Sequence, residues 1–190
     1  MNLYKKQPNH QFQPMTSPIK RLPAPAQHIR EAYRQLVAEI DELARELATT
    51  RFPNVLQCRP GCDECCMCFS VLPLEAAILA EAMKDVQLPK HGNTEKCVLL
   101  SGGLCQVYTA RPIICRTQGL PLGYVDEFAG TIEVSACPLN FTDDYSFGED
   151  DLLYMDDFNR RFVKLNHEYC RCVGLDPGGR IPLAGFYQNK

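Results

Sequence analysis

Cysteine is the residue of this chain best suited to chemistry, and four cysteines stand within nine residues. They follow the pattern Cys58-x-x-x-Cys62-x-x-Cys65-Cys66, and Cys68 comes two positions later. Thiolates are soft, strong ligands for zinc, copper(I) and iron–sulfur clusters. Because the spacing is this tight, several sulfurs can reach one metal ion. Residues 58–66, called the cysteine motif below, therefore predict a thiolate metal site.

The composition favours a metal site over a disulfide scaffold. The chain has 190 residues, a net charge of −3 and eleven cysteines, an odd number that fits a closed set of disulfides poorly. Residues 1–20 contain no apolar signal segment, and no apolar run approaches the roughly 20 residues of a membrane span. We therefore expect a cytoplasmic protein, among reduced thiols, where disulfides are rare. The modest charge gives no bulk attraction to a membrane or to nucleic acid.

A second set of cysteines follows at wider spacing: Cys97, Cys105, Cys115 and Cys137. Residues 97–108 carry two short apolar runs around a Ser-Gly-Gly turn, which predicts a β-hairpin. Such a hairpin would hold Cys97 and Cys105 near its two ends. Together with the motif, these cysteines would suffice for two four-thiolate sites, or for one site with accessory thiols.

The identity of the metal stays open between zinc and an iron–sulfur centre. Structural zinc takes four ligands, often in pairs spaced by two to four residues, and iron–sulfur clusters take four thiolates from similarly tight runs. Adjacent Cys65 and Cys66 point differently in most backbones and could serve different metals, or different irons of one cluster. The spacing of the first three cysteines also occurs in radical SAM enzymes. Glu64 in place of an aromatic residue, the spare thiolate of Cys66 and the lack of a repeated strand–helix pattern argue against that class.

Two long amphipathic helices are the main elements expected to position these thiols. Apolar stripes in steps of three and four predict one helix over 27–50 and another over 149–172. The two stripes could pack together as an antiparallel pair. The stripe residues are Ile29, Tyr33, Leu36, Ile40, Leu43 and Leu47 in the first helix, and Met155, Phe158, Phe162, Leu165, Tyr169 and Cys172 in the second.

Shorter elements complete the expected fold. Pro73 suits the first turn of a third helix, whose buried face would be Leu74, Ile78 and Ala82, and residues 131–136 predict a strand. The predicted class is α+β: a small cysteine-rich metal-binding core with a β-hairpin, flanked by the two long amphipathic helices.

Residues 1–26 predict a disordered N-terminal arm, because prolines interrupt any periodicity and polar residues dominate. The arm is basic and could contact nucleic acid, but without interleaved aromatic residues a solvated tail is the simpler interpretation. Residues 27–190 are expected to form a single domain. The helix over 27–50 could supply the seam of a homodimer, although docking on its own domain is the ordinary interpretation.

Two arginines, Arg111 and Arg116, flank Cys115. A tetrathiolate zinc site carries a net charge of about −2, and nearby cations would offset it. This structural interpretation is the simpler one. The alternative is that the arginines bind an anionic substrate or cofactor beside the metal.

The remaining cysteines and the histidines carry weaker signals. Cys172 continues an apolar stripe and is expected to be a buried small hydrophobe. Cys170 lies off that stripe and could face the cluster or solvent, and Cys68 could be an extra ligand. Among the histidines, only His91 stands near a cysteine of the second set.

The ordered cysteine pattern resembles the signature of the YkgJ-type cysteine-cluster family, also called the CxxCxxCC domain. The resemblance spans residues 58–138, and the ordered combination is far more specific than the motif alone. Leu74-Glu75-Ala76 also resembles the family's helix start. Beyond the motif, the matching stretches are Cys97-Val-Leu-Leu, Gly103-Leu-Cys105-Gln-Val-Tyr108, Arg111-Pro112-Ile-Ile-Cys115-Arg116 and Cys137-Pro138.

The family is described as zinc- or iron-chelating, and a similar cysteine pattern occurs in bacterial flagellin lysine-N-methylases. The resemblance implies a metal-chelating protein that binds zinc or an iron–sulfur centre in a structural or interaction role. The alternative is an iron–sulfur redox or group-transfer enzyme. Besides the metal ion, a protein or small-molecule partner is expected that the sequence does not identify. The implied ligands are Cys58, Cys62, Cys65, Cys66, Cys97, Cys105, Cys115 and Cys137.

Overall fold

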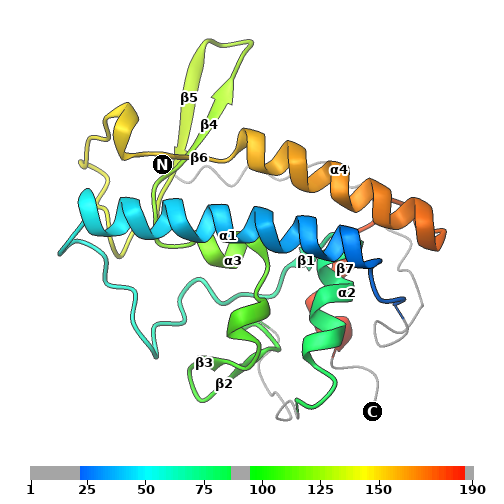
Figure 1. Cartoon of the computed structure of the whole chain (residues 1–190). Coiled ribbons are helices and arrows are strands. Elements are labelled where there is room, and N and C mark those ends of the chain that lie inside the picture. Colours follow the sequence, from blue (N-terminus) through cyan, green and yellow to red (C-terminus); the bar gives the residue numbers. More distant parts are fainter. Residues whose placement is uncertain (1–21, 87–94, 187–190) are drawn as a thin grey trace.

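The structure, a computed structural model, describes residues 22–86 and 95–186. Two long helices, α1 (Gln27–Thr50) and α4 (Asp156–Val173), run side by side in opposite directions (Figure 1). The shorter helix α2 (Pro73–Ala82) contacts α4, and α3 (Ile113–Thr117) contacts α1. Within the described residues, three small sheets accompany them. Helices and strands are mixed in this way in the α+β class, as predicted.

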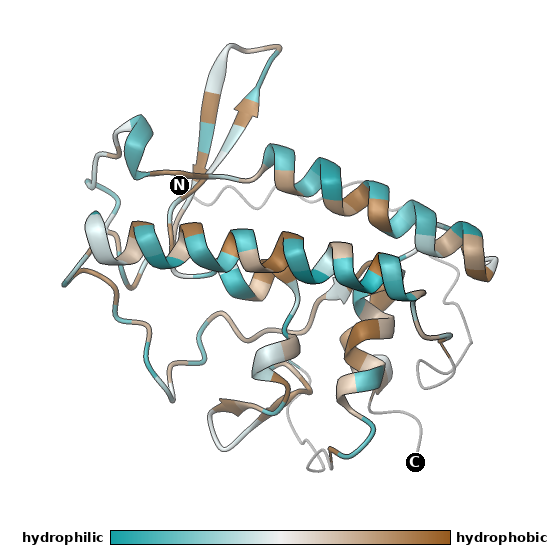
Figure 2. Ribbon diagram, in the orientation of Figure 1, coloured by the Kyte–Doolittle hydropathy of each residue, from teal (hydrophilic) through white to brown (hydrophobic). Residues whose placement is uncertain are grey.

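The helix pair predicted from the two apolar stripes is confirmed. Ile40 of α1 is 0% exposed and Phe162 of α4 is 8% exposed, and the rings of Tyr33 and Phe162 lie 5.9 Å apart. At the edge of the pair, Arg161 donates to both carboxylate oxygens of Glu39 at 2.7 and 3.0 Å. Figure 2 shows how apolar residues recur between polar ones along both helices. The stripe of α1 is thus covered within the chain from Ile29 to Ile40, whereas Leu43 is 42% exposed. A homodimer through this helix stays a prediction.

The second long helix starts later than predicted, at Asp156. The stretch before it folds as a 3-10 turn, η3 (Glu149–Asp151), and a short strand, β6 (Leu153–Tyr154). Asp151 accepts the backbone N–H of Gly148 at 2.9 Å and forms an ion pair with Arg51. The acidic run resembled a helix N-terminus in the sequence. In the structure, Asp151 of this run caps the turn at Gly148 and pairs with Arg51, the residue that follows α1.

The two cysteines at the end of α4 are placed the other way round from the prediction. Cys172 is exposed, whereas Cys170 is fully buried. Since α1 begins opposite Glu168, the last turn of α4 extends beyond the α1 stripe. The buried side of α4 turns there toward α2, where the Asn166 side chain accepts the backbone N–H of Leu74 at 3.1 Å.

Helix α2 begins at Pro73 as predicted, but it is buried on more than one face. Leu74 is fully buried and Ile78 half-buried, while Ala82 is exposed, so the predicted face is wrong at its C-terminal end. Its sequence is apolar nearly all round, and both hydrophobic cores of the molecule enclose it. The other buried residues of α2 are Pro73, Glu75, Ala76, Ala77 and Leu79.

Both predicted β regions form. Within 97–108, β2 (Leu100–Ser101) and β3 (Leu104–Cys105) pair antiparallel. The intervening Gly102 and Gly103 have φ of 59° and 76°, as the tight hairpin turn with two left-handed residues requires. The strand predicted over 131–136 is β5 (Thr131–Ser135).

The other strand pairs were not predicted. β4 (Leu122–Asp126) pairs antiparallel with β5 in a hairpin that projects beyond the helices (Figure 1), and it pairs in parallel with β6. β1 (Ser70–Val71) pairs antiparallel with β7 (Ile181–Pro182). This second pair ties the segment that follows the cysteine motif to the C-terminal part of the chain.

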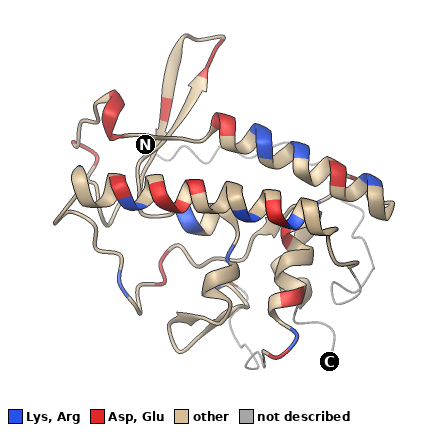
Figure 3. Cartoon of the chain, viewed as in Figure 1, with Lys and Arg blue, Asp and Glu red and all other residues tan. Residues whose placement is uncertain are grey.

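Two hydrophobic cores support the site. The first lies between α1 and α4, and the second joins α2 to residues 97–107 and 181–186. Residues 22–26, the end of the predicted arm, lie against the domain, where the carbonyl of Pro23 accepts a hydrogen bond from the Tyr169 hydroxyl at 2.8 Å. The predicted disorder of the rest of the arm concerns residues outside those described. Acidic and basic residues are both present along the two long helices (Figure 3). Among the described residues, no helix is long and apolar enough to cross a membrane.

Candidate metal centre

The cysteine motif folds as two consecutive tight turns. The Cys62 N–H donates to the carbonyl of Arg59 at 3.0 Å, and the Cys66 N–H donates to that of Asp63 at 2.9 Å. Gly61, with a φ of 92°, supplies the left-handed conformation at the first turn. The turns hold the cysteines close together without a regular helix or strand.

Residues 95–97 hold the motif in place from the side. The Cys97 N–H donates to the carbonyl of Cys66 at 2.9 Å. The ammonium group of Lys96 donates to both the carbonyl and the carboxylate of Asp63, at 3.0 and 2.9 Å. The first cysteine of the predicted hairpin region therefore lies directly beside the motif.

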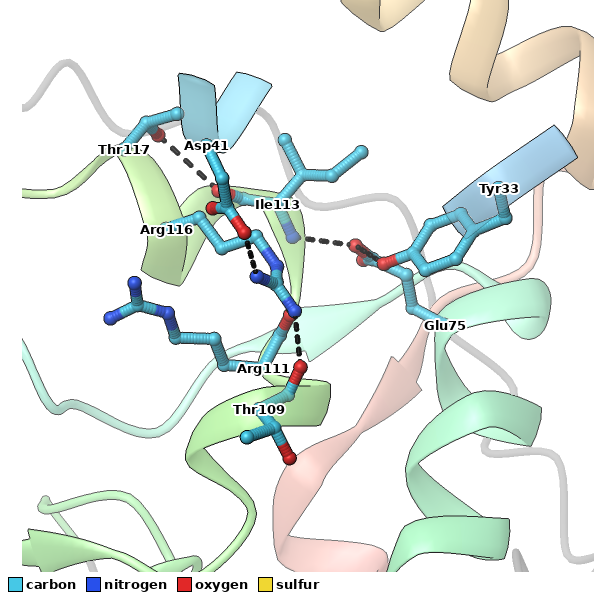
Figure 4. A network of polar contacts seen from close by, with 8 residues as sticks. All are labelled: Tyr33, Asp41, Glu75, Thr109, Arg111, Ile113, Arg116 and Thr117. Atoms are coloured by element: carbon cyan, nitrogen blue, oxygen red, sulfur yellow. Dashed lines mark hydrogen bonds and ion pairs between the residues drawn. The ribbon is translucent and has the colours of Figure 1, made fainter. Parts of the chain in front are cut away.

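Helix α3 carries Cys115, and a buried carboxylate holds its N-terminus (Figure 4). Glu75, only 5% exposed, accepts the backbone N–H of Ile113 at 2.8 Å and the hydroxyl of Tyr33 at 3.0 Å. Burial raises the pKa of Glu75, and these two hydrogen bonds partly oppose that rise. A helix leaves its first N–H groups without partners, so the Glu75 carboxylate fixes the start of α3 against α2.

Arg116 anchors the same helix from another direction (Figure 4). Its guanidinium forms an ion pair with Asp41 on α1 at 2.6 Å and donates to the carbonyls of Arg111 at 2.9 Å and Thr109. The side chain is 8% exposed. Three protein groups thus occupy Arg116, and it does not line the cavity that contains the cysteines.

Seven of the eight predicted ligands line one cavity of about 510 Å³. Leu99, Leu100 and Leu183 give part of the lining an apolar character. The cysteines come from the motif, from both ends of the hairpin region and from α3. They are Cys58, Cys62, Cys65, Cys66, Cys97, Cys105 and Cys115.

Arg111 also lines this cavity, with its guanidinium 4.0 Å above the centre of the Tyr108 ring. Its Nε atom is buried and has no hydrogen-bond partner among the residues that the structure describes. A buried donor without an acceptor costs free energy. Arg111 is therefore a cation available to an anion or a thiolate in the cavity, which Arg59 also lines.

Cys137, the eighth predicted ligand, does not belong to the lining. Its carbonyl accepts the N–H groups of Asn140 and Phe141 at 3.0 and 2.9 Å, which makes a tight turn after β5. Cys68 does not line the cavity either, and its thiol donates to the carbonyl of Lys96 at 3.0 Å. His91 lies outside the described residues.

Burial makes four of the cavity thiols hard to ionise. It raises the pKa of Cys66 to about 12, with further contributions from the neighbouring charges of Cys65, Cys97 and Cys105. Burial likewise raises the pKa of Cys65, Cys97 and Cys115. A thiolate cluster of this kind needs a compensating cation, and a bound metal ion provides one as it displaces the thiol protons.

The donor set fits a thiolate-bound metal in its chemistry, but its sulfurs do not converge on one point. Within residues 22–86 and 95–186, no group of three or more His, Cys, Asp or Glu side chains comes together closely enough to hold a metal ion. All eleven cysteines are free thiols. Because the motif is a loop held by turns, it could close around an ion, as expected where metal binding is coupled to folding.

Comparison with known families finds a similarity over this part of the chain. Residues 57–138 match the family model CxxCxxCC, described as "Putative zinc- or iron-chelating domain". The matched stretch, 82 of the 190 residues, is similar to this family. The match confirms the resemblance seen in the sequence. Neither curated proteins nor solved structures gave a match to the chain.

Glu75, inside the matched stretch, and Asn140, just beyond it, both contribute to the site. The sequence did not mark either of them as a site residue. Glu75 stood in the helix start that resembled the family, and only the fold shows that it reaches the N-terminus of α3. Asn140 follows the last matched stretch, and its Nδ2 lies 3.6 Å from the sulfur of Cys58. An asparagine in a loop gives no sequence signal for such a contact, because its partner is far away along the chain.

Proposed function

We propose that this protein chelates a metal, zinc or an iron–sulfur centre, through the cysteines that line the cavity. The observation that carries this proposal is the gathering of seven free cysteines from separate segments around one cavity. A single buried cysteine behaves as a small hydrophobe, but hydrophobic packing gives no reason for seven thiols at one cavity. The zinc- or iron-chelating description of the family supports the same function.

The mutual placement of the thiols supports two groups within the cavity. Cys66, Cys97, Cys105 and Cys115 form the inner group, because the charges of Cys97, Cys105 and Cys66 all contribute to raising the pKa of Cys115. Cys66 also interacts with Cys65 and so links the two groups. The outer group contains Cys58, Cys62 and Cys65, and the first two likewise raise the pKa of Cys65. The inner group has the four thiolates that zinc or an iron–sulfur cluster takes. Cys137, the eighth cysteine of the family pattern, would join the outer group only if its turn moved.

Anaerobic purification followed by metal analysis and an absorption spectrum tests this function. A colourless protein with stoichiometric zinc would support a structural or interaction role, since zinc has no redox chemistry. A brown protein with iron and labile sulfide would support an iron–sulfur centre. A protein that contains neither metal, and takes up neither from solution, would contradict the proposal.

The second candidate is an iron–sulfur redox or group-transfer enzyme. The cavity of about 510 Å³ favours it, because small-molecule sites are roughly 300–1,000 Å³ in volume. The unpartnered Nε of Arg111 supports a contact with an anionic substrate or cofactor beside the metal, and Arg116 would contribute indirectly by holding the Arg111 carbonyl.

Arg111→Ala separates the two roles of this arginine. For the enzyme class, the variant keeps its metal content but loses thermal stabilisation by an anionic probe such as inorganic phosphate. If Arg111 instead offsets thiolate charge, the variant loses metal. Arg160→Ala is the matched control, because Arg160 is exposed and lies on α4 away from the cavity.

A cytoplasmic location belongs to the same proposal. Thiolate ligands persist where glutathione and thioredoxin keep cysteines reduced, and all eleven cysteines are free. Beyond the metal, a protein or small-molecule partner stays a prediction. Contact of the basic N-terminal arm with nucleic acid concerns residues outside those described.

A further inference from the structure

We propose that Asn140 is a positioning residue of the metal centre, which donates an amide N–H to the sulfur of Cys58 and sets where that sulfur meets the metal. The inference rests on the proposed metal-binding function. It assigns a role to a residue that lies just beyond the matched domain, which ends at residue 138.

The amide of Asn140 makes three contacts with the segments that surround it. Its Oδ1 accepts the backbone N–H of Gln57 at 2.8 Å. Its Nδ2 lies 2.7 Å from the carbonyl oxygen of Gly119 and 3.6 Å from Cys58 Sγ. An asparagine amide has two N–H donors and an acceptor oxygen, so all three contacts can form together. One side chain thereby fixes both the backbone before Cys58 and the sulfur itself.

Gly119 closes the other side of the same sulfur. A Cβ atom at this position would lie 2.5 Å from Cys58 Sγ, and the φ of Gly119 is 99°. The sulfur therefore packs directly on the Gly119 backbone, in a place that no other residue type would leave free. The amide of Asn140 and the backbone of Gly119 together define where Cys58 can lie.

Asn140 also joins the segments of three cysteines. It contacts Cys58 directly, it binds the carbonyl of Gly119 in the turn after α3, which carries Cys115, and its own backbone N–H donates to the carbonyl of Cys137 at 3.0 Å. This arrangement gives the turn at Cys137 a function without requiring its thiol in the cavity. The turn presents Asn140 to the outer group of cysteines.

A hydrogen bond to a metal-bound thiolate stabilises its negative charge and fixes its direction. Groups that contact ligands in this way typically contribute about 10–100-fold to metal affinity. At an iron–sulfur centre, hydrogen bonds to the sulfurs also tune the reduction potential. Both effects act through the Cys58 sulfur. If Asn140 only supported the loop, its effect on metal binding would not depend on that sulfur.

Competition titration with a chromophoric zinc chelator on the full-length chain tests the inference. We expect Asn140→Ala to lower zinc affinity by roughly 10–100-fold. Asn159→Ala, at an exposed helical asparagine, is the matched control and should leave the affinity unchanged. If circular dichroism shows that Asn140→Ala does not fold, Asn140→Asp is measured instead. It keeps the acceptor for Gln57, replaces the N–H donor by a negatively charged oxygen beside the Cys58 sulfur, and should also lower the affinity. Equal affinities for the wild type and the folded Asn140 variant would overturn the inference.

A double-mutant cycle with Cys58→Ser tests whether Asn140 acts through Cys58. In the Cys58→Ser background, Asn140→Ala should cause no further loss, because the sulfur that it positions is gone. If the losses of zinc affinity from the two substitutions simply add, Asn140 supports the fold without acting through Cys58, and the inference is overturned. Should Cys58→Ser bind no zinc, the sulfur-to-metal absorption of the Co²⁺-loaded Asn140 variant decides, and a spectrum identical to that of the wild type overturns it. A wild-type chain that binds no metal would instead contradict the proposed function.

Discussion

The carboxylate of Glu75 accepts the backbone N–H of Ile113 at 2.8 Å, in a place almost closed to solvent. Glu75 lies on the helix that follows the cysteine motif, and Ile113 opens the helix that carries Cys115. The motif and the more distant cysteine are thus joined by one hydrogen bond between two helices. This contact explains how a loop-rich region places thiols from separate segments at one cavity.

Replacing Glu75 tests the importance of that contact. Glu75→Ala leaves the Ile113 N–H and the Tyr33 hydroxyl without their acceptor, and we expect a loss of roughly 2–4 kcal/mol in the free energy of unfolding. Glu75→Gln keeps an acceptor oxygen and should lose about 1 kcal/mol or less. Urea unfolding of the metal-free protein measures both. Equal losses for the two variants would show that these hydrogen bonds do not account for the stability that Glu75 provides.

The pH dependence of unfolding should also change with Glu75→Gln. Burial raises the pKa of Glu75 above its usual value of 4.5, so the folded state holds this proton more tightly than the unfolded state. The wild type therefore loses stability relative to Glu75→Gln as the pH rises from 4.5 through the folded pKa. Urea unfolding of both proteins across this range measures the difference. A difference that does not vary with pH would mean that the carboxyl titrates normally.

Gly119 and Gly130 form a matched pair for testing the packing around Cys58. Both have positive φ, 99° and 63°, but only at Gly119 would a Cβ meet the Cys58 sulfur, whereas Gly130 has open space. Gly130→Ala should cost about 1–2 kcal/mol of stability from backbone strain alone. Gly119→Ala should cost more and also reduce metal content, as measured by elemental analysis. Equal metal content in the two variants would contradict the placement of Cys58 in the centre.

Cysteine-to-serine substitutions separate the cavity thiols from the rest. We expect Cys66→Ser and Cys115→Ser, in the inner group, to lose most of the bound metal, because serine is a poor ligand for soft metals. Cys172→Ser, at an exposed thiol, should keep it. Cys137→Ser should resemble Cys172→Ser more than Cys66→Ser, since its thiol does not line the cavity. Metal-to-protein ratios of the purified variants measure this order, and loss of metal from Cys172→Ser would contradict it.

The periodic helices and the hairpin were predictable because their signals are local. The stripe from Ile29 to Leu47 gave α1 with its observed bounds, and the Ser-Gly-Gly turn marked the hairpin. Where tertiary contacts compete with local preference, the sequence misled. The acidic residues 149–151 satisfy a turn and Arg51 instead of opening α4.

The cysteines of the site could be named from their spacing, but the residues that position them could not. The spacing and the family resemblance selected eight cysteines, and seven of them line the cavity. The contacts of Asn140 and Glu75 join residues far apart in the chain, and such pairings depend on topology. Likewise, Cys170 is buried and Cys172 exposed, the reverse of the prediction, because α1 begins opposite Glu168 and does not cover the last turn of α4. The periodicity of α4 alone does not reveal where α1 begins.

The most direct measurement of metal binding by the cavity thiols is a count of reactive thiols in the full-length chain before and after metal removal. The anaerobically purified protein is treated with a thiol reagent, with and without prior chelation, and alkylated positions are mapped by mass spectrometry. The account predicts that the seven cavity cysteines are protected before chelation and react after it, while exposed Cys172 reacts in both samples. The same thiols reacting to the same extent in both samples would contradict it.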